Sequence, residues 1–280
     1  MKKIITHINP DLDAVTAVWL IKRFLPGWEE AKIGFVEASV TTEKQVKADE
    51  DPDTLFVDVG RGKLDHHQTG KYLSASKLCL EYIFAARKDQ PLSSLEEKAL
   101  EKIVEVVTQI DNARDLNWEE VNKSRYHFYL HDLIDGLRGL AKTDSQVMEF
   151  GFLALEAILL NLKNKLKAEE ELKKGIEFQT PWGKGIALES GNKKVLWEGE
   201  VQGYVLVVKK DPKEGGVQIY SRADSQVDLS LAYQKIKKLD PQSDWFLHAS
   251  KKLLLNQSSV NLNMRPTKLS LAQIIEVLKS

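Results

Sequence analysis

The chain has a single cysteine and no long uninterrupted apolar run. Because Cys79 stands alone, no internal disulfide can form, and we expect a reducing compartment. Met1-Lys2-Lys3 resembles the start of a signal peptide, but Pro10 and its polar neighbours end the apolar segment at once. The longest apolar run, 150–160, contains Glu156 and is too short to span a bilayer. The sequence therefore predicts a cytoplasmic protein with no membrane partner.

Net charge is also small. The formal charge of −1 argues against a protein that coats nucleic acid through charge alone. The charges are unevenly distributed: residues 1–170 carry 23 Lys and Arg against 29 Asp and Glu, and residues 171–280 carry 17 against 12. An acidic part could hold cations and a basic part could hold an anionic substrate. A chance division of surface charge explains the same figures.

The composition is that of a soluble globular protein with two domains or one large one, at 280 residues and 42% hydrophobic content. Apolar segments predict strands at 4–6, 33–36 and 54–57, with a helix over 14–24 between the first two. A long helix is predicted over 145–174. Beyond it, short apolar segments separated by glycine turns predict a small α+β domain.

Two further element predictions concern segments of ambiguous pattern. Residues 195–197 are predicted as one of the short strands of the second domain. Residues 125–140 are predicted as one helix, which would place His127 and His131 on one face, a spacing that can bind zinc. Since no glutamate stands between them as in the zinc-protease pattern, we favour an amphipathic surface helix.

Three side chains that can bind metals lie within seven residues near the N-terminus: His7, Asp11 and Asp13. They follow a predicted strand and precede a predicted helix, and Pro10 forces the chain to turn between the two. In open α/β sheets, ligands bind at the carboxyl ends of strands. A turn that merely starts a helix, with an Asp cap, explains the same residues, so this loop alone does not decide.

A second group of such residues follows the strand at 54–57. Asp58 stands at its carboxyl end, two turn glycines come next, and Asp65-His66-His67 follows. Adjacent histidines are uncommon in a chain with six in all. One imidazole can bind a metal while a neighbouring carboxylate fixes its tautomer. We therefore favour a ligand site here over a polar hairpin with surface histidines.

Asp111 ends the apolar stripe of a helix that begins near Ser93. A carboxylate at a position that the stripe places near the core is costly unless it is paired or bound to metal. Pairing with Arg114 is the alternative explanation.

Four motifs, taken in chain order, resemble those of the DHH phosphoesterase superfamily. They are His7-x3-Asp11-x-Asp13, Asp58, Asp65-His66-His67 and Asp111. Its members include RecJ-type exonucleases, family II pyrophosphatases, exopolyphosphatases, and phosphodiesterases of short oligonucleotides and cyclic dinucleotides. Residues 57–60, 65–68 and 110–112 are also similar to the Myg-type DHH nucleases. The resemblance implies a parallel-sheet α/β DHH domain at 1–162. A helical connector at 163–174 would join it to a smaller α+β substrate-binding cap domain at 175–280.

The resemblance also implies a site for two divalent cations, manganese foremost and magnesium as the alternative. Six side chains would bind them, with Asp58 as the bridge: His7, Asp11 and Asp58 for one ion, and Asp13, Asp58, His66 and Asp111 for the other. Asp65 would support this set from behind, and His67 would face the substrate; these two form the expected catalytic pair. Mostly carboxylate ligands with some imidazole suit manganese or magnesium on chemical grounds as well.

The second domain of the superfamily usually carries a Gly-Gly-Gly-His segment that contacts the substrate. The nearest counterpart here, residues 245–250, has no glycine, and the polar run 256–259 is an alternative loop. Trp245 and Phe246 could stack a base. Five side chains are candidates for phosphate contacts: Arg222, His248, Lys251, Lys252 and Arg265.

The sequence thus predicts a metal-dependent phosphohydrolase for short oligonucleotides or dinucleotides, since the chain lacks the charge to hold long nucleic acid. A phosphoanhydride such as pyrophosphate or polyphosphate is the alternative substrate. A metal-containing binding or regulatory protein without catalysis is the alternative from another class. The oligomeric state stays open, a homodimer included.

Overall fold

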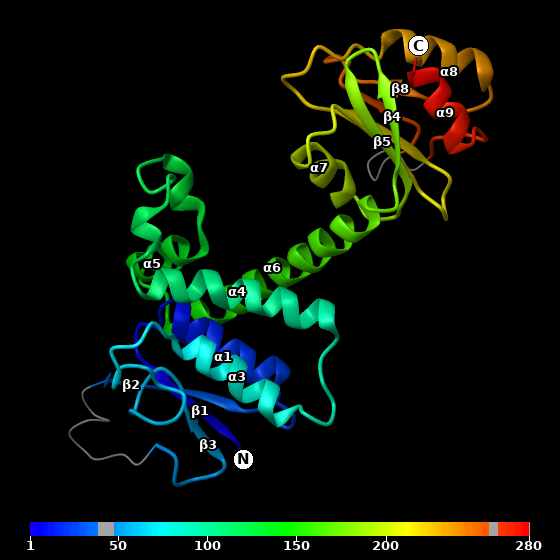
Figure 1. Ribbon diagram of the computed structural model, residues 1–280. Coiled ribbons are helices and arrows are strands. Elements are labelled where there is room, and N and C mark those ends of the chain that lie inside the picture. Colours follow the sequence, from blue (N-terminus) through cyan, green and yellow to red (C-terminus); the bar gives the residue numbers. More distant parts are fainter. Residues whose placement is uncertain (39–47, 258–262, 280) are drawn as a thin grey trace. The chain divides into compact units, whose positions relative to one another are not determined.

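The computed structural model describes residues 1–38, 48–257 and 263–279, and the chain divides into two compact units (Figure 1). Unit 1 is Met1–Leu162 and unit 2 is Lys163–Ser280. The polar run 256–259 considered above as a substrate loop lies partly outside the described residues.

Unit 1 is an α/β unit built on a three-stranded parallel sheet in the order β2-β1-β3. The central strand β1 (Lys3–His7) pairs with β2 (Lys32–Val36) on one side and with β3 (Thr54–Phe56) on the other. Because the strands are parallel, their carboxyl ends meet at one edge of the sheet. His7 ends β1 and Asp58 follows β3, so these two side chains meet at that edge.

Three helices pack together beside this sheet. They are α1 (Leu12–Phe24), α3 (Ala75–Ala86) and α4 (Ser94–Asp111), each in contact with the other two (Figure 1). Helix α1 is buried along most of its length, which explains its nearly continuous apolar sequence. The side chains of Ser74 and Ser93 cap α3 and α4, so the start of α4 near Ser93 is as predicted.

The segment predicted as one helix over 125–140 is two elements. A 3-10 turn, η2 (Ser124–Phe128), is followed by one extended residue and then by helix α5 (Leu130–Gly139). The predicted placement of His127 and His131 on one helix face is therefore wrong.

Packing around a tyrosine explains this break. The hydroxyl of Tyr126 donates a hydrogen bond to the buried carboxylate of Asp115, which opens the 3-10 turn η1 (Asp115–Asn117). The Tyr126 ring also packs edge-on against Tyr129 and His131. These contacts fix the turn at a position where the helical pattern alone would have continued.

Helix α6 (Asp144–Leu172) belongs to unit 1 as far as Leu162 and to unit 2 beyond it. A Cβ added at Gly151 would lie 2.4 Å from the Val15 Cγ1 atom, so α6 packs against α1 with no space for a side chain there. Among the described residues, α6 is the one helix that is long and apolar enough to cross a membrane, judged by length and composition only. Its contact with α1 accounts for part of that apolar character.

Unit 2 contains a six-stranded mixed sheet in the order β4-β5-β6-β7-β9-β8. The strands are β4 (Ile176–Thr180), β5 (Gly183–Glu189), β6 (Leu206–Lys210), β7 (Val217–Ser221), β8 (Phe246–Leu247) and β9 (Leu253–Leu255). Strands β5 and β6 are parallel, and the other described pairs are antiparallel.

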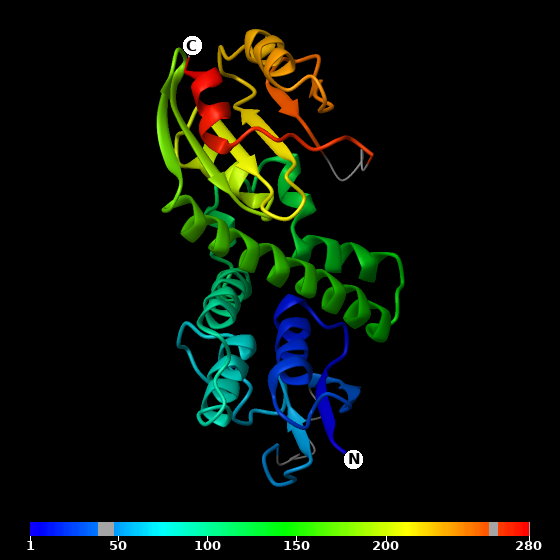
Figure 2. The same ribbon diagram turned by 90° about the vertical axis from the view of Figure 1, so that its right-hand side faces the viewer.

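Helices cover both faces of this sheet (Figure 2). On one face, α8 (Ser230–Leu239) and α9 (Leu271–Leu278) pack on Ala187 and Val208. On the other, α7 (Lys194–Val201) and the end of α6 pack on the alternate residues of the same strands, such as Val207. This is the small α+β unit that the sequence predicts.

The segment 195–197, predicted as a strand, is part of α7. Val195 and Leu196 are buried against the sheet, and a Cβ added at Gly199 would lie 2.7 Å from the Val207 Cγ2 atom. A short apolar run suits a buried strand and one face of a short helix equally well. The close approach at Gly199 is what the strand prediction missed.

Candidate metal centre

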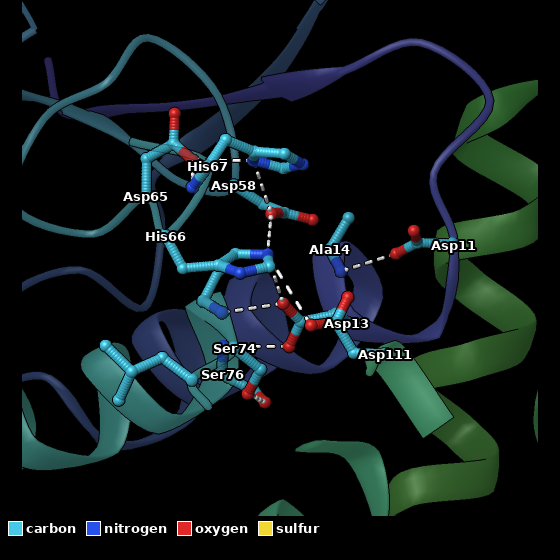
Figure 3. A network of polar contacts seen from close by, with 12 residues as sticks. Asp11, Asp13, Ala14, Asp58, Asp65, His66, His67, Ser74, Ser76 and Asp111 are labelled. Atoms are coloured by element: carbon cyan, nitrogen blue, oxygen red, sulfur yellow. Dashed lines mark hydrogen bonds and ion pairs between the residues drawn. The ribbon is translucent and has the colours of Figure 1, made fainter. Parts of the chain in front are cut away.

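Asp58 lies at the centre of the predicted site (Figure 3). Its backbone is left-handed, with φ 57°, a conformation that Asp tolerates better than most residues. Its N–H donates to the Leu64 carbonyl over 3.0 Å. The Asp58 residue is 3% exposed. This turn therefore places a buried carboxylate directly beyond the end of β3.

Two imidazoles approach this carboxylate from different segments. His66 Nε2 lies 3.3 Å from Asp58 Oδ1 (Figure 3). His7 Nε2 lies 3.3 Å from Asp58 Oδ2. The other ring nitrogen of His7, Nδ1, lies 2.8 Å from the Ile8 carbonyl oxygen. That contact assigns a proton to Nδ1 and turns Nε2 toward the site, as in histidines that bind metals.

The three groups shift one another's pKa. Burial would lower the pKa of His7, but Asp58 and the Ile8 carbonyl outweigh burial and raise it to about 9. Asp58 likewise raises the pKa of His66 to about 9, against the effect of burial. Burial would raise the pKa of Asp58, but the two imidazoles outweigh burial and lower it. Pairing with Asp58 therefore favours the protonated form of both rings.

Asp13 is held by the N-terminus of α3. Its Oδ2 and Oδ1 atoms accept hydrogen bonds from the Ala75 and Ser76 N–H groups over 2.6 and 2.9 Å (Figure 3). The residue is 2% exposed, and its Oδ2 atom lies 3.8 Å from His66 Nε2. Burial, together with the neighbouring carboxylates, raises its pKa well above the usual value.

Asp11 and Asp111 complete the cluster from two helix ends. Asp11 caps α1 by accepting a hydrogen bond from the Ala14 N–H over 3.0 Å. Asp111 ends α4, and its Oδ2 atom lies 3.6 Å from His66 Nε2. Burial raises the pKa of both carboxyls, that of Asp111 to about 6.

Asp65 supports the outer side of the site. Its Oδ1 atom lies 2.7 Å from His67 Nδ1, and it also accepts the His67 N–H over 3.1 Å. Its Oδ2 atom accepts the Arg61 N–H over 2.6 Å. Asp65 is 3% exposed, whereas the His67 side chain is 59% exposed. A buried carboxylate thus orients a ring that faces solvent.

The described residues contain three groups of side chains that could each hold a metal ion, and within each group the donor atoms all lie within 4.8 Å of one another. They are His7, Asp11 and Asp58; Asp13, His66 and Asp111; and Asp58, His66 and His67. The first two groups correspond to the two expected ligand sets, and Asp58 reaches into both through its contacts with His7 and His66. The structure therefore brings all six expected ligands together, and their binding of metal stays a prediction.

Two buried atoms in this cluster, Asp58 Oδ1 and His66 Nε2, lie 3.3 Å apart as an ion pair but make no hydrogen bond in the part of the chain that the structure describes. Buried polar atoms are normally satisfied. Burial, and after it the neighbouring carboxylates, raises the pKa of the surrounding carboxyls, so a charged carboxylate is unfavourable here without a cation. Divalent cations would satisfy both atoms and compensate the charge, so the oxygen and nitrogen donors fit such ions.

The cluster opens into a pocket of about 650 Å³. Its wall includes His7, Asp58 and His67, and also Arg61, which the sequence analysis did not select. The available signal was its position between Gly60 and Gly62, directly before the Asp-His-His motif.

Two of the five predicted phosphate contacts in unit 2 are arginines with carboxylate partners. The Arg222 guanidinium donates two hydrogen bonds to Asp224, over 3.1 and 2.8 Å. The Arg265 guanidinium donates two to Asp244, over 3.1 and 2.8 Å. Both pairs are on the surface of unit 2.

The other three candidates lie near β9. Lys251 Nζ donates to Asp228 Oδ2 over 2.9 Å, and Lys252 Nζ donates to two backbone carbonyls in the loop before α8. His248 Nδ1 lies 2.8 Å from Ser250 Oγ. Its Nε2 atom makes no hydrogen bond with the described residues, so His248 is the candidate most available to a ligand.

No protein-family model and no curated protein matches the chain. Among solved structures, it is similar to RecJ from Thermus thermophilus in complex with Mg²⁺, at 13% identity and a TM-score of 0.32. That match covers 99% of this chain and 49% of the RecJ chain, so this chain spans about half the length of RecJ.

A second similar structure is a putative family II inorganic pyrophosphatase from Methanococcus jannaschii, at 14% identity and a TM-score of 0.23, with 100% of both chains covered. A third is an uncharacterized protein from Helicobacter pylori, at 12% identity and a TM-score of 0.26, with 99% of both chains covered. Identity and TM-score are low in all three matches, so these similarities do not assign a function.

Proposed function

We propose that this protein is a metal-dependent phosphohydrolase whose six clustered ligands bind two divalent cations, manganese or magnesium. The observation that carries the proposal is that six carboxylate and imidazole side chains converge in one cluster, where the buried atoms Asp58 Oδ1 and His66 Nε2 lie 3.3 Å apart without a hydrogen bond. Carboxylate and imidazole donors without a thiolate favour these ions over softer ones.

When bound, two such ions lower the pKa of a shared water and stabilise charge on phosphoryl oxygens. The chain's own residues divide the remaining duties. Asp58 directs one oxygen toward each ligand group. Asp65 holds His67 Nδ1, so that the other ring nitrogen, Nε2, is free to contact the substrate phosphate from the pocket.

The proposed substrates are short single-stranded oligonucleotides or dinucleotides, with phosphoanhydrides as the alternative. A chain with a net charge of −1 is poorly suited to long nucleic acid. In unit 2 we propose His248 as a substrate contact. Arg222, Lys251, Lys252 and Arg265 would join it by exchanging their present partners for phosphate.

The first test is turnover by purified, metal-stripped protein after manganese or magnesium is added. A reporter such as bis(p-nitrophenyl) phosphate should be hydrolysed, and chelator should abolish the activity. If no member of a broad panel of phosphate esters and anhydrides turns over with any divalent ion, the enzyme proposal fails. Two tightly bound ions without turnover would instead support a metal-containing binding or regulatory protein.

A competition experiment tests the substrate class. RNA of two to five nucleotides and pyrophosphate are offered together to the manganese-loaded protein, and both products are followed over time. Faster turnover of the RNA supports the proposal. Faster turnover of pyrophosphate overturns the choice of substrate and leaves the two-metal site in place.

A further inference from the structure

Arg61 stands in a backbone conformation that arginine rarely adopts. Its φ is 56°, in the left-handed region, and it follows Gly60 at φ 89°. Glycine would adopt this conformation without strain, whereas a residue with a Cβ is strained there. Strained residues of this kind concentrate at functional sites, where the surrounding structure holds them in place.

Asp65 is the group that holds Arg61 in place. Its Oδ2 atom accepts the Arg61 N–H over 2.6 Å, while its Oδ1 atom lies 2.7 Å from His67 Nδ1. One buried carboxylate therefore fixes both the turn at Arg61 and the orientation of the His67 ring. Arg61 and His67 are both exposed, and both line the pocket that His7, Asp11 and Asp58 also line.

The Arg61 guanidinium makes no hydrogen bond, ion pair or ring contact with any described residue. Every other arginine does make one: those at 23, 125, 138, 222 and 265 pair with carboxylates, that at 87 donates to backbone carbonyls, and that at 114 stacks on Tyr72. Among the described residues that line the pocket, Arg61 is also the one Lys or Arg. It is thus an unpaired cation directed to a pocket that otherwise carries carboxylates and histidines.

We infer that Arg61 binds a second phosphate of the substrate, adjacent to the phosphate that is hydrolysed, and thereby sets substrate preference; this rests on the proposed function. Three of the expected metal ligands, His7, Asp11 and Asp58, line the same pocket and are buried or half-buried, whereas Arg61 is exposed. Arginine's planar guanidinium can bind two phosphate oxygens at once. The preferred substrates are then those with two neighbouring phosphates, such as a 5′-phosphorylated dinucleotide or pyrophosphate.

The test compares a substrate with one phosphate and a substrate with two. The first is bis(p-nitrophenyl) phosphate, and the second is the diadenosine dinucleotide pApA, which carries a 5′ phosphate beside its internucleotide phosphate. In Arg61→Gln and Arg61→Gly, the KM for the dinucleotide should rise about 10- to 100-fold, the range for a lost charge-assisted contact. The KM for the one-phosphate reporter and both kcat values should stay unchanged. Gly removes the backbone strain and Gln keeps it, so equal losses assign the effect to the guanidinium.

Lys63→Gln is the matched control. It removes the same charge two positions away, from a side chain that lies over the Tyr82 ring and does not line the pocket. Neither substrate should be affected. An equal rise in KM in Lys63→Gln would mean that overall charge, and not Arg61, selects the substrate, and would overturn the inference.

Binding of imidodiphosphate, measured by calorimetry on the manganese-loaded protein, provides a readout independent of turnover. Affinity should fall in both Arg61 variants and stay at the wild-type value in Lys63→Gln, while Arg61→Gly melts at or above the wild-type Tm. Unchanged KM and unchanged affinity in the Arg61 variants overturn the inference and leave the proposed function standing. If the wild type turns over neither substrate, the proposed function fails, and the calorimetry still decides whether Arg61 binds the diphosphate.

Discussion

The two units treat their carboxylates in opposite ways. In unit 1, burial and neighbouring carboxylates raise the pKa of Asp13 well above its usual value, and burial raises that of Asp111 to about 6. In unit 2, hydrogen bonds from Arg265 lower the pKa of Asp244 to about 2, and Arg222 lowers that of Asp224. Asp13 and Asp111 thus lie buried among other carboxylates, whereas Asp224 and Asp244 each pair with an arginine at the surface.

This difference separates a site from a surface. An exposed ion pair is complete in itself, and solvent and salt screen its contribution to stability. A buried cluster of carboxylates with raised pKa values lowers the stability of the folded state until a cation binds there. Since a ligand that binds only the folded state stabilises that state, metal should raise the stability of the protein through unit 1.

The largest effect should come from Asp58→Asn. The change removes one negative charge from between two proposed cations. It also removes the carboxylate with which His7 and His66 pair. We expect both ions to be lost on gel filtration. Loss of a residue that only supports a metal ligand lowers activity by up to about 100-fold, so loss of the bridging carboxylate should lower it by more than that. Metal content and rate are measured on the same preparation.

Asp51→Asn is the control for Asp58→Asn. Asp51 precedes the same strand β3, where it accepts a hydrogen bond from the Asp53 N–H and another from Thr54. The same substitution at this end of the strand should leave two ions bound. Retention of two ions by Asp58→Asn would show that Asp58 does not bridge them.

The next largest effect should come from His67→Ala. His67 is exposed to the pocket and oriented by Asp65, so its loss should leave both ions bound. The rate should fall about 100-fold or more, as for a side chain that assists proton transfer or contacts the reacting group. By contrast, His66→Ala, at the neighbouring position, should lose both activity and metal. Loss of both ions in His67→Ala would make it a ligand, as its proximity to Asp58 and His66 allows.

The sequence predicts most of this site because the ligands follow strand ends or occupy helix ends. His7, Asp58 and Asp111 could be placed at strand and helix ends from periodicity, and the resemblance to the DHH superfamily joined them into one expected ligand set. Arg61 could not, because neither its left-handed backbone nor its lack of a partner has a signature in one sequence. The ion pairs of Arg222 and Arg265 could not be foreseen either, since the first depends on the turn that joins it to Asp224 and the second on the approach of Asp244, 21 residues away in the sequence.

The fold follows the same division. The sequence predicts long, strongly periodic segments such as α1 and α6 close to their observed limits. It predicts a strand at 195–197, where the chain is helical, and no element at 253–255, where the chain forms a strand. The first run is helical because Gly199 permits close packing on β6. The second, Leu253–Leu255, is the strand β9, defined by pairing with β7 and β8 and not by any period of its own.

A smaller effect is expected from pH on the metal-free protein. The pKa of His7 and His66 is raised from 6.5 to about 9 in the folded chain, so both bind protons more tightly when folded. Their stabilisation is therefore complete below pH 6.5 and is lost as pH rises through about 9. The Tm in chelator should fall across this window, and His7→Gln should reduce the slope.

Manganese should reverse that trend, because ligation requires neutral imidazoles and so strengthens as pH rises. The same melting series with added manganese therefore supplies the comparison. A flat Tm in chelator between pH 6.5 and 9 would contradict the pairing of these histidines with Asp58.

A modest effect is expected from His248→Ala in unit 2. If its free Nε2 atom contacts phosphate, the KM should rise several-fold while metal content and kcat stay unchanged. Ser250→Ala removes the hydroxyl beside His248 Nδ1 and keeps the imidazole, so it should produce a smaller rise. Unchanged KM in His248→Ala would place the substrate contact elsewhere in the protein.

The smallest effect is expected from Arg222→Gln and Arg265→Gln, which break the exposed pairs with Asp224 and Asp244. Because solvent and salt screen these pairs, the Tm should stay close to the wild-type value, and two ions should stay bound. The KM is the informative readout. If these arginines exchange their carboxylates for substrate phosphate, each variant raises the KM, and the increase shrinks as salt is added. If the pairs are purely structural, the KM stays at the wild-type value at every salt concentration, and these two arginines are removed from the proposed contacts.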